Sequence, residues 1–334
     1  AYGENRSQAP AELYRSGEDP LGIPALTLVA GSPPSYNNFC DIDRQLQTMT
    51  HIVAGLEKNI GAPNKFAVVL GAKHGNCCGA GIQEEFLGAI RKMIEGDPRA
   101  IFGGVVMVNF RIDKARAETL LHYGMPEGKR RLLDCIVASG FDEDAVELLQ
   151  RKEGKCRLLA NPRLGTLSAD DLDTSARRRQ VRGGFLLQPN YTFVLDLAAS
   201  YMTRYAYGTE RKDSWADLVL AWAIGSTSNS NTITLVRKGK LLGNAVGQQD
   251  RVGSAELAVK RAKDAGHSIT GAVAYSDSFF PFPDGPQVLI DARVSAIFAT
   301  SGSVNDKKVI DVCVEARVAL YMAPDEVARG FFGH

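Results

Sequence analysis

The sequence has almost no net charge and no long apolar segment, and these absences exclude several classes of protein. Its 39 Lys and Arg residues nearly balance its 38 Asp and Glu residues, so no net positive field attracts nucleic acid or an anionic membrane surface. No apolar run approaches the ~18 residues of a membrane-spanning helix, and the first eight residues are too polar for a secretory signal. We therefore expect a cytoplasmic protein with no nucleic-acid partner and no membrane partner.

Cysteine is sparse and irregularly spaced, which argues against a disulfide-stabilised secreted domain. The chain has six cysteines in 334 residues, whereas small secreted domains are dense in paired cysteines. We expect reduced thiols. Hydrophobic residues make up 45% and charged residues 23%, as in ordinary folded proteins, and the length predicts two or three packed units.

The common phosphate-binding and zinc-binding patterns are also missing. No loop ends in G-K-[ST] and no G-x-G-x-x-G opens a helix, which disfavours ATP and NAD as ligands. His74, Cys77 and Cys78 are metal-ligand types, but adjacent cysteines rarely converge on one ion. The zinc deaminase pattern, H-x-E followed by P-C-x-x-C, does not occur. We expect no zinc.

Alternating strand and helix patterns predict an α/β protein. Apolar β-branched runs predict strands at 66–70, 102–109, 232–236 and 294–300. Helical periodicity predicts helices at 41–56, 83–93, 142–150, 215–224, 255–265 and 307–314.

A polar stretch with little apolar periodicity divides the chain. We predict a first α/β subdomain at 1–165, a linker at 166–184 and a second α/β subdomain at 185–334. Residues 68–81 and 235–249 weakly echo one another, since each runs from a strand through a basic, Gly-containing turn toward a helix.

The segment with the clearest chemical potential is Lys73-His74-Gly75, which follows an apolar strand. A Gly-rich turn at the end of a buried strand is where α/β proteins place ligands. A neutral imidazole accepts a proton near pH 7, and an ammonium stabilises a developing oxyanion. The alternative is an exposed Lys beside a His that caps a turn, and the residues themselves leave both interpretations open.

Four later segments have equally open interpretations. Ser230-Asn231 and residues 243–251 form either a polar ligand floor or a hairpin and helix cap. The aromatic segment 278–285 either stacks a planar heterocycle or plugs a loop. Residues 301–303 follow an apolar strand, and residues 329–334 carry an Arg and a His of the kind usually found on a mobile surface.

Taken in order, these segments resemble the AICAR transformylase domain of the bifunctional purine enzyme, which formylates aminoimidazole-carboxamide ribonucleotide (AICAR) and cyclises the product to IMP. The similarity extends over nearly the whole chain. Its residues are Tyr2-Gly3-Glu4-Asn5, 34–38, Lys73-His74, Phe102-Gly103-Gly104, 181–184, Ala221-Trp222, Ser230-Asn231, 247–249 with Arg251, 279–284, 301–303 and His334.

The resemblance implies two cytidine-deaminase-like α/β subdomains in tandem, with helices layered on mixed sheets. It also implies a homodimer with active sites between subunits, and 10-formyltetrahydrofolate as the cosubstrate that formylates AICAR to FAICAR in purine biosynthesis. In this reaction His74 would take the proton of the 5-amine, and Lys73 would assist the formyl oxygen or the departing folate nitrogen. Asn231 would hold the tetrahedral intermediate.

The same resemblance assigns binding residues by position. Those implied for the nucleotide substrate are Tyr2, Gly3, Asn38, Phe102, Gly103, Asp134, Phe279, Asp284, Arg329 and His334. Those implied for the folate cosubstrate are Arg251, Val252, Ser303 and Val304. Arg329 would be a bidentate partner for phosphate.

Two departures from the family pattern motivate alternatives. Where the family has an Arg before the Tyr-Gly pair this chain has Ala1, and the family's Asn-Pro-His-Gln is Asn5-Arg6-Ser7-Gln8. One alternative is formyl transfer to a different amino-heterocycle. Another is a non-catalytic nucleotide-binding module, which the retained Lys73 and His74 disfavour. The resemblance does not include a cyclohydrolase domain, so we expect a separate cyclohydrolase to close the product to IMP.

Overall fold

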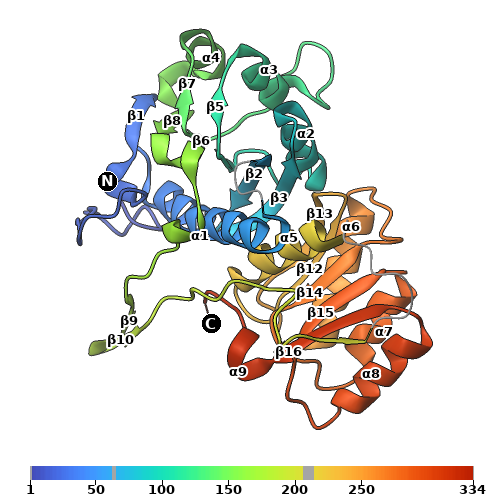
Figure 1. The fold of residues 1–334 in the computed structure, drawn as a ribbon. Coiled ribbons are helices and arrows are strands. Elements are labelled where there is room, and N and C mark those ends of the chain that lie inside the picture. The colour runs from blue at the N-terminus through green and yellow to red at the C-terminus, as the bar shows by residue number, and fades with distance from the viewer. Residues whose placement is uncertain (1, 62–64, 206–213, 334) are drawn as a thin grey trace.

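A computed structural model describes residues 2–61, 65–205 and 214–333 and confirms the predicted α/β class (Figure 1). Its main sheet has 12 strands in the order β1-β8-β6-β4-β2-β3-β13-β12-β14-β15-β16-β11, and two further pairs, β9-β10 and β5-β7, lie outside it. The cytidine-deaminase-like detail stays a prediction.

The first half of the chain forms one side of this sheet. Its elements are β1 Thr27–Ala30, α1 Tyr36–Ile60, β2 Ala67–Lys73, β3 Asn76–Gln83, α2 Phe86–Gly96, β4 Val105–Val108, β5 Arg111–Ile112, α3 Lys114–His122, β6 Cys135–Ala138, β7 Gly140–Phe141, α4 Glu143–Leu149 and β8 Arg157–Ala160. Short 3₁₀ helices lie at Ile23–Ala25, Lys152–Gly154, Pro162–Thr166 and Ala169–Asp171.

The second half forms the other side. Its elements are β9 Arg177–Val181, β10 Gly184–Gln188, β11 Thr203–Tyr205, α5 Trp215–Ser226, β12 Ile233–Arg237, β13 Lys240–Ala245, α6 Arg251–Asp264, β14 Val273–Ser276, α7 Asp284–Asp291, β15 Ala296–Ser301, α8 Asp306–Glu315, β16 Ala319–Pro324 and α9 Asp325–Ala328.

The two halves repeat one pattern of strand pairing. In the first, β2 pairs antiparallel with β3 and β4, and β6 lies parallel between β4 and β8. In the second, β12 pairs antiparallel with β13 and β14, and β15 lies parallel between β14 and β16. The halves join where Lys240 of β13 pairs with Gly81 of β3. This repetition extends the weak echo in the sequence, while the subdomain limits 1–165, 166–184 and 185–334 stay predictions.

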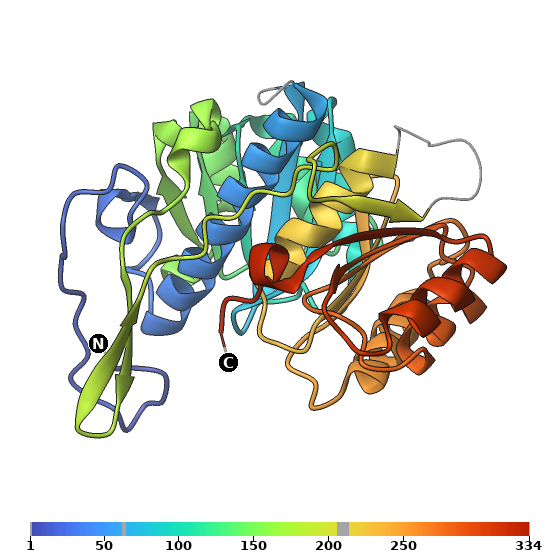
Figure 2. The ribbon, with the colours of Figure 1, turned by 60° about the horizontal axis from the view of Figure 1, so that its bottom comes forward.

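Helices cover both faces of the sheet in three hydrophobic cores. On β2, Val68 and Leu70 belong to the core that contains α1 and α5, whereas Val69 belongs to the core beneath α2, α3 and α4. A third core lies beneath α6, α7 and α8. Helices α1 and α5 pack closely because Gly55 has no side chain: a Cβ there would lie 2.7 Å from Val219. The central helices therefore connect the two halves (Figures 1 and 2).

Every predicted helix and strand overlaps an observed one, with one local correction. Residues 102–104 are a turn rather than the start of a strand, since Gly103 has a positive φ of 71° and breaks the extended run. The predicted linker contains strand β9, which pairs with β10 in a ribbon that projects from the body beside the N-terminal segment (Figure 2).

Candidate active site

His74 lies at the tip of a tight β-hairpin. Lys73 pairs with Asn76 across β2 and β3, so His74 and Gly75 are the two residues of the loop. Their φ angles are 55° and 69°, as a type I′ turn requires. Glycine adopts this conformation readily, but a residue with a Cβ does so uncommonly. The turn leaves His74 exposed and Lys73 half-buried, and both are accessible to a small molecule.

A buried carboxylate supports this turn from below. The Oδ1 atom of Asp41, on α1, accepts a hydrogen bond from the backbone N–H of Gly75 at 2.5 Å. Burial raises the pKa of Asp41, while the Gly75 hydrogen bond and the neighbouring His74 act in the opposite direction. The carboxylate therefore ties the loop that carries His74 to the central helix.

The hairpin tip borders a cleft of about 260 Å³ between the two halves. Its lining includes Lys73, His74 and Cys77 from the first half, and Asn244, Val246 and Arg261 from the second. The amide of Asn244 donates a hydrogen bond to the Cys77 carbonyl at 3.2 Å and holds the walls together. The charged residues of the lining are Lys73, Arg261 and Asp97, so the cleft offers two positive groups and one negative group to a polar ligand.

Three residues implied for the substrate lie at the same end of the sheet as Lys73. The Lys73 ammonium donates a hydrogen bond to the Phe102 carbonyl at 2.8 Å. Gly103 follows directly, and the backbone N–H of Asp134 donates to the Gly104 carbonyl at 3.1 Å. The Asp134 carboxylate also lies 3.6 Å from Arg151. The structure thus brings together Lys73, His74, Phe102, Gly103 and Asp134.

Asn231 lies in a second group, on the loop between α5 and β12. Its side-chain amide donates to the Gln248 carbonyl at 2.9 Å, and the backbones of the two residues also pair. Gln248 lies two residues beyond Val246, which lines the cleft. Asn231 itself does not line the cleft. Its connection to the cleft runs through its hydrogen bond to Gln248, which lies close to Val246 in the chain.

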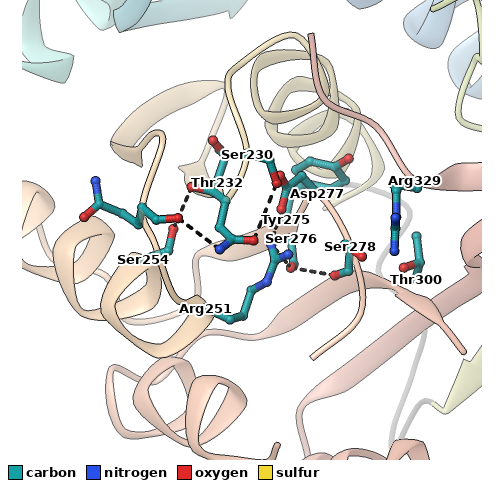
Figure 3. Close-up of polar contacts among 12 residues, drawn as sticks. Ser230, Thr232, Arg251, Ser254, Tyr275, Ser276, Asp277, Ser278, Thr300 and Arg329 are labelled. Atoms are coloured by element: carbon teal, nitrogen blue, oxygen red, sulfur yellow. Dashed lines mark hydrogen bonds and ion pairs between the residues drawn. The ribbon is translucent and has the colours of Figure 1, made fainter. Parts of the chain in front are cut away.

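Arg251 and Val252 begin helix α6 next to this group. The Arg251 guanidinium points toward the buried carboxylate of Asp277 and lies 3.2 Å from the Ser276 hydroxyl (Figure 3). The side chains of Arg251 and Asp277 are 9% and 0% exposed. Arg251 is therefore engaged inside the protein, and its predicted contact with folate stays a prediction.

A third group forms at the carboxyl ends of the parallel strands β14, β15 and β16, where α/β sheets commonly bind ligands. The Asp325 carboxylate accepts hydrogen bonds from Ser278 and Thr300 and pairs with Arg329 at 2.7 Å. The Arg329 guanidinium also lies 5.8 Å from the centre of the Phe279 ring.

The remaining residues implied for this group differ in exposure. Asp284, at the start of α7, is exposed, and its carboxylate accepts a hydrogen bond from the Gly285 N–H. Ser303 is half-buried, and Val304 is 100% exposed.

The N-terminal predicted residues gather at the start of α1. Tyr2 and Tyr36 line a shared hollow of about 320 Å³, and the Gly3 N–H donates to the Gln8 carbonyl. Asn38 is 8% exposed, and its side chain accepts from the N–H and hydroxyl of Ser35, which caps the helix. His334 lies outside the described residues.

Sequence reasoning missed four residues that support these groups: Asp41, Arg44, Asp277 and Asp325. Each carries a charge that is fully or partly withdrawn from solvent, which is the available structural signal. In the sequence they look like any other charged residue near a helix or strand end. A single sequence offers no sign that they would have partners far along the chain.

Burial gives the two cysteines near His74 little thiolate character. It raises the pKa of the Cys77 thiol strongly and that of the Cys78 thiol to about 12. In the described part of the chain, no three His, Cys, Asp or Glu side chains cluster so as to hold a metal ion. The expected lack of zinc stays a prediction. Among the same residues, no helix combines the length and apolarity needed to cross a membrane.

Comparison with known proteins identifies the family. Residues 1–261 match the family model described as AICARFT/IMPCHase bienzyme. The chain is 36% identical over 321 residues to the bifunctional purine biosynthesis protein PurH of Cutibacterium acnes and 33% identical over 326 residues to that of Anoxybacillus flavithermus. The PurH of Aquifex aeolicus is 28% identical over 319 residues.

Each of these alignments covers 96% of this chain but only 56% of the relative. The chain thus spans little more than half the length of the bifunctional proteins it matches. With the match to the family model extending over most of its length, the chain belongs to the AICARFT/IMPCHase bienzyme family.

Proposed function

We propose that this chain is the folate-dependent formyltransferase that transfers a formyl group from 10-formyltetrahydrofolate to the 5-amine of AICAR and produces FAICAR in purine biosynthesis. The observation that carries the proposal is the placement of His74 beside Lys73 at the tip of a supported hairpin on the rim of a cleft. The relatives are named as purine biosynthesis proteins, which supports the same reaction.

The proposed reaction needs one base and one acid. The AICAR amine attacks the formyl carbon, a new C–N bond forms, and His74 takes the amine proton. The bond from the formyl carbon to the N10 atom of folate then breaks, and N10 takes up a proton. Lys73 is the donor we assign to the formyl oxygen or to N10, since its ammonium already donates to the Phe102 carbonyl nearby. Asn231 would stabilise the tetrahedral intermediate.

The other two groups supply binding surfaces in this proposal. Arg329 and Phe279 would contact the nucleotide, because an exposed guanidinium suits phosphate and a ring suits a heterocycle. Arg329 keeps 46% of its side chain exposed despite its pairing with Asp325. Arg251, Val252, Ser303 and Val304 would face the folate, and the exposed Val304 suits its apolar ring. Tyr2, Gly3, Asn38, Gly103, Asp134 and Asp284 complete the proposed nucleotide contacts.

We further propose that the functional unit is a homodimer with active sites between subunits. The ribbon formed by β9 and β10 projects from the body (Figure 2) and exposes Phe185, Leu186 and Leu187 by 56%, 59% and 60%. A two-stranded ribbon with exposed apolar side chains is marginal by itself. A second copy of the chain is the partner that would cover it. We place this reaction in the cytoplasm.

A competition assay tests the proposed reaction. The protein is given 10-formyltetrahydrofolate together with AICAR and related amino-heterocycles, and each formylated product is quantified. Preferential formation of FAICAR supports the proposal. Preference for another amine would indicate a divergent transferase, which the Ala1, Arg6 and Ser7 departures motivate. Binding of AICAR without any formylated product would indicate a nucleotide-binding module.

A further inference from the structure

Helix α1 contacts both loops that carry the proposed catalytic residues. Asp41 and Arg44 are three residues apart and therefore lie on neighbouring turns of the same helix face. Asp41 accepts the Gly75 N–H of the His74 turn. Arg44 donates at 2.6 Å to the carbonyl of Thr227 and at 3.2 Å to the side-chain oxygen of Asn229, on the loop that leads to Asn231. One short stretch of helix thus reaches two loops far apart in the sequence.

Asn229 links this contact to the loop that carries Asn231. The Asn229 carbonyl accepts hydrogen bonds from the Gly247 N–H at 3.0 Å and from the Thr232 hydroxyl at 2.6 Å, so it connects the Asn231 loop to the turn after β13. Both terminal nitrogens of Arg44 donate hydrogen bonds to the side-chain oxygen of Asn229. Arg44 also lies 4.7 Å from the centre of the Phe332 ring, and burial lowers its pKa to about 10. The Arg44 guanidinium therefore packs against the loop as a hydrogen-bond donor and is not a solvated surface charge.

The second half repeats the Asp41 arrangement without a catalytic residue. Asp217, on α5, accepts the N–H groups of Lys238 and Gly239 at 2.7 and 2.6 Å. These residues form the two-residue turn between β12 and β13, with φ angles of 53° and 68°. Asp41 and Asp217 are each 9% exposed. A buried aspartate under a hairpin turn is therefore a repeated structural device, and only the turn above Asp41 carries His74.

We propose that Asp41 and Arg44 are positioning residues that hold the His74 turn and the Asn231 loop in fixed relation to each other through helix α1. Neither touches substrate in this inference. Each acts through the loop it binds, so its loss displaces a catalytic group without removing it. Displacement by about 1 Å can lower a reaction rate by about 10²-fold. This inference rests on the formyltransferase function proposed above.

The test uses two variants and two matched controls. Asp41→Ala is paired with Asp217→Ala, which removes the same kind of carboxylate from a turn with no catalytic residue. Arg44→Ala is paired with Arg131→Ala. Arg131 is 3% exposed and likewise donates to backbone carbonyls, those of Leu120 and Tyr123 at 2.7 Å, but it lies in none of the three groups. Unfolding temperature, kcat and both KM values are measured for all four.

We expect Asp41→Ala and Arg44→Ala to lower kcat by about 10- to 100-fold with both KM values changed less than about threefold, the pattern of a transition-state effect. The controls should lose comparable thermal stability and keep kcat. Guanidinium ion at low millimolar concentration should restore part of the activity of Arg44→Ala but leave Arg131→Ala unchanged. Equal kcat in variants and controls, or a loss of kcat proportional to unfolded protein, would overturn the inference.

Two further observations keep the test decisive. If an alanine variant does not fold, Asp41→Leu and Arg44→Met take its place, because each fills a similar volume but makes no hydrogen bond to the loop. A loss of kcat in the folded size-matched variant supports positioning, and full activity opposes it. If the wild-type protein transfers no formyl group to any amine, the proposed function fails. If the wild type is active and the variants are equally active, only the positioning inference fails.

Discussion

The guanidinium of Arg251 and the carboxylate of Asp277 form an ion pair that the second half of the molecule almost fully encloses, with 9% and 0% of the two side chains exposed. Removing one partner of such a pair leaves a buried charge without compensation. We expect Asp277→Ala to lower the free energy of unfolding by about 3–5 kcal/mol, measured by urea denaturation.

The control for this prediction is the exposed pair Lys260 and Asp264 on α6. Asp264→Ala should leave the urea midpoint nearly unchanged, since exposed pairs contribute little. The double variant Arg251→Met/Asp277→Leu should lose less stability than the summed losses of the single variants Arg251→Met and Asp277→Leu. Additive losses would show that the pair is not energetically coupled.

His74 is expected to act as the general base. His74→Ala should lower kcat by roughly 10²–10⁴-fold, the usual contribution of a placed base, with KM changed much less. Lys73→Met should act in the same direction, and the double variant should lose less than the product of the single effects. His122→Ala is the matched control, because His122 is exposed and its ring bonds to the Lys129 carbonyl. Wild-type turnover in His74→Ala would refute the assignment.

The proposed dimer predicts a mass of about twice 36.1 kDa in light scattering at micromolar concentration. Leu186→Lys places a charge on the exposed ribbon and should shift the protein toward monomer and lower its activity together. Ile60→Lys provides the control, since Ile60 is 38% exposed at the end of α1, away from the ribbon. A wild-type monomer that turns over substrate would contradict the shared active site.

We expect the proposed formyl transfer to proceed without zinc. Metal analysis of the purified protein should find far less than one zinc ion per chain, and chelators should leave the rate unchanged. The basis is the absence of the H-x-E and P-C-x-x-C pattern from the sequence, together with the lack of a cluster of three His, Cys, Asp or Glu side chains among the described residues. About one zinc per chain, removed together with activity, would overturn this expectation.

We expect the protein to lose stability at acid pH because the buried His51 becomes protonated on unfolding. This side chain is fully buried, its Nδ1–H donates to the Gln47 carbonyl at 2.7 Å, and its ring stacks on Tyr191. Burial lowers its pKa from 6.5 to about 4, so the unfolded chain binds the proton more readily than the folded protein. The contribution of neutral His51 to the free energy of unfolding is therefore complete above pH 6.5. It is lost progressively between pH 6.5 and 4, by roughly 3 kcal/mol at most.

Urea denaturation at several pH values checks this prediction. Other groups also titrate in this range, so the informative quantity is the difference between the wild type and His51→Phe. The phenylalanine variant keeps an aromatic ring against Tyr191 but cannot be protonated. It should lose clearly less stability than the wild type between pH 6.5 and 4. Identical losses in both proteins would show that His51 does not cause the acid sensitivity.

The sequence alone determined the features that depend on neighbouring residues. The apolar period of residues 41–56 predicted most of helix α1, and the β-branched run at 66–70 predicted most of β2, because these signals need only local contacts. The residue types of the basic, Gly-containing turn were sufficient to mark His74 as a candidate base. The ordered resemblance of many short segments indicated the family.

Only the tertiary structure decided how distant charges are paired. Asp41 lies under the Gly75 turn, Arg44 reaches the Asn229 loop, and Arg251 meets Asp277. No local pattern specifies these pairs, since whether a charge is buried depends on which elements pack against it. The packing of α1 against α5 through Gly55 brings the two halves together. That long-range contact, set by core packing, places the proposed catalytic loops on one helix face.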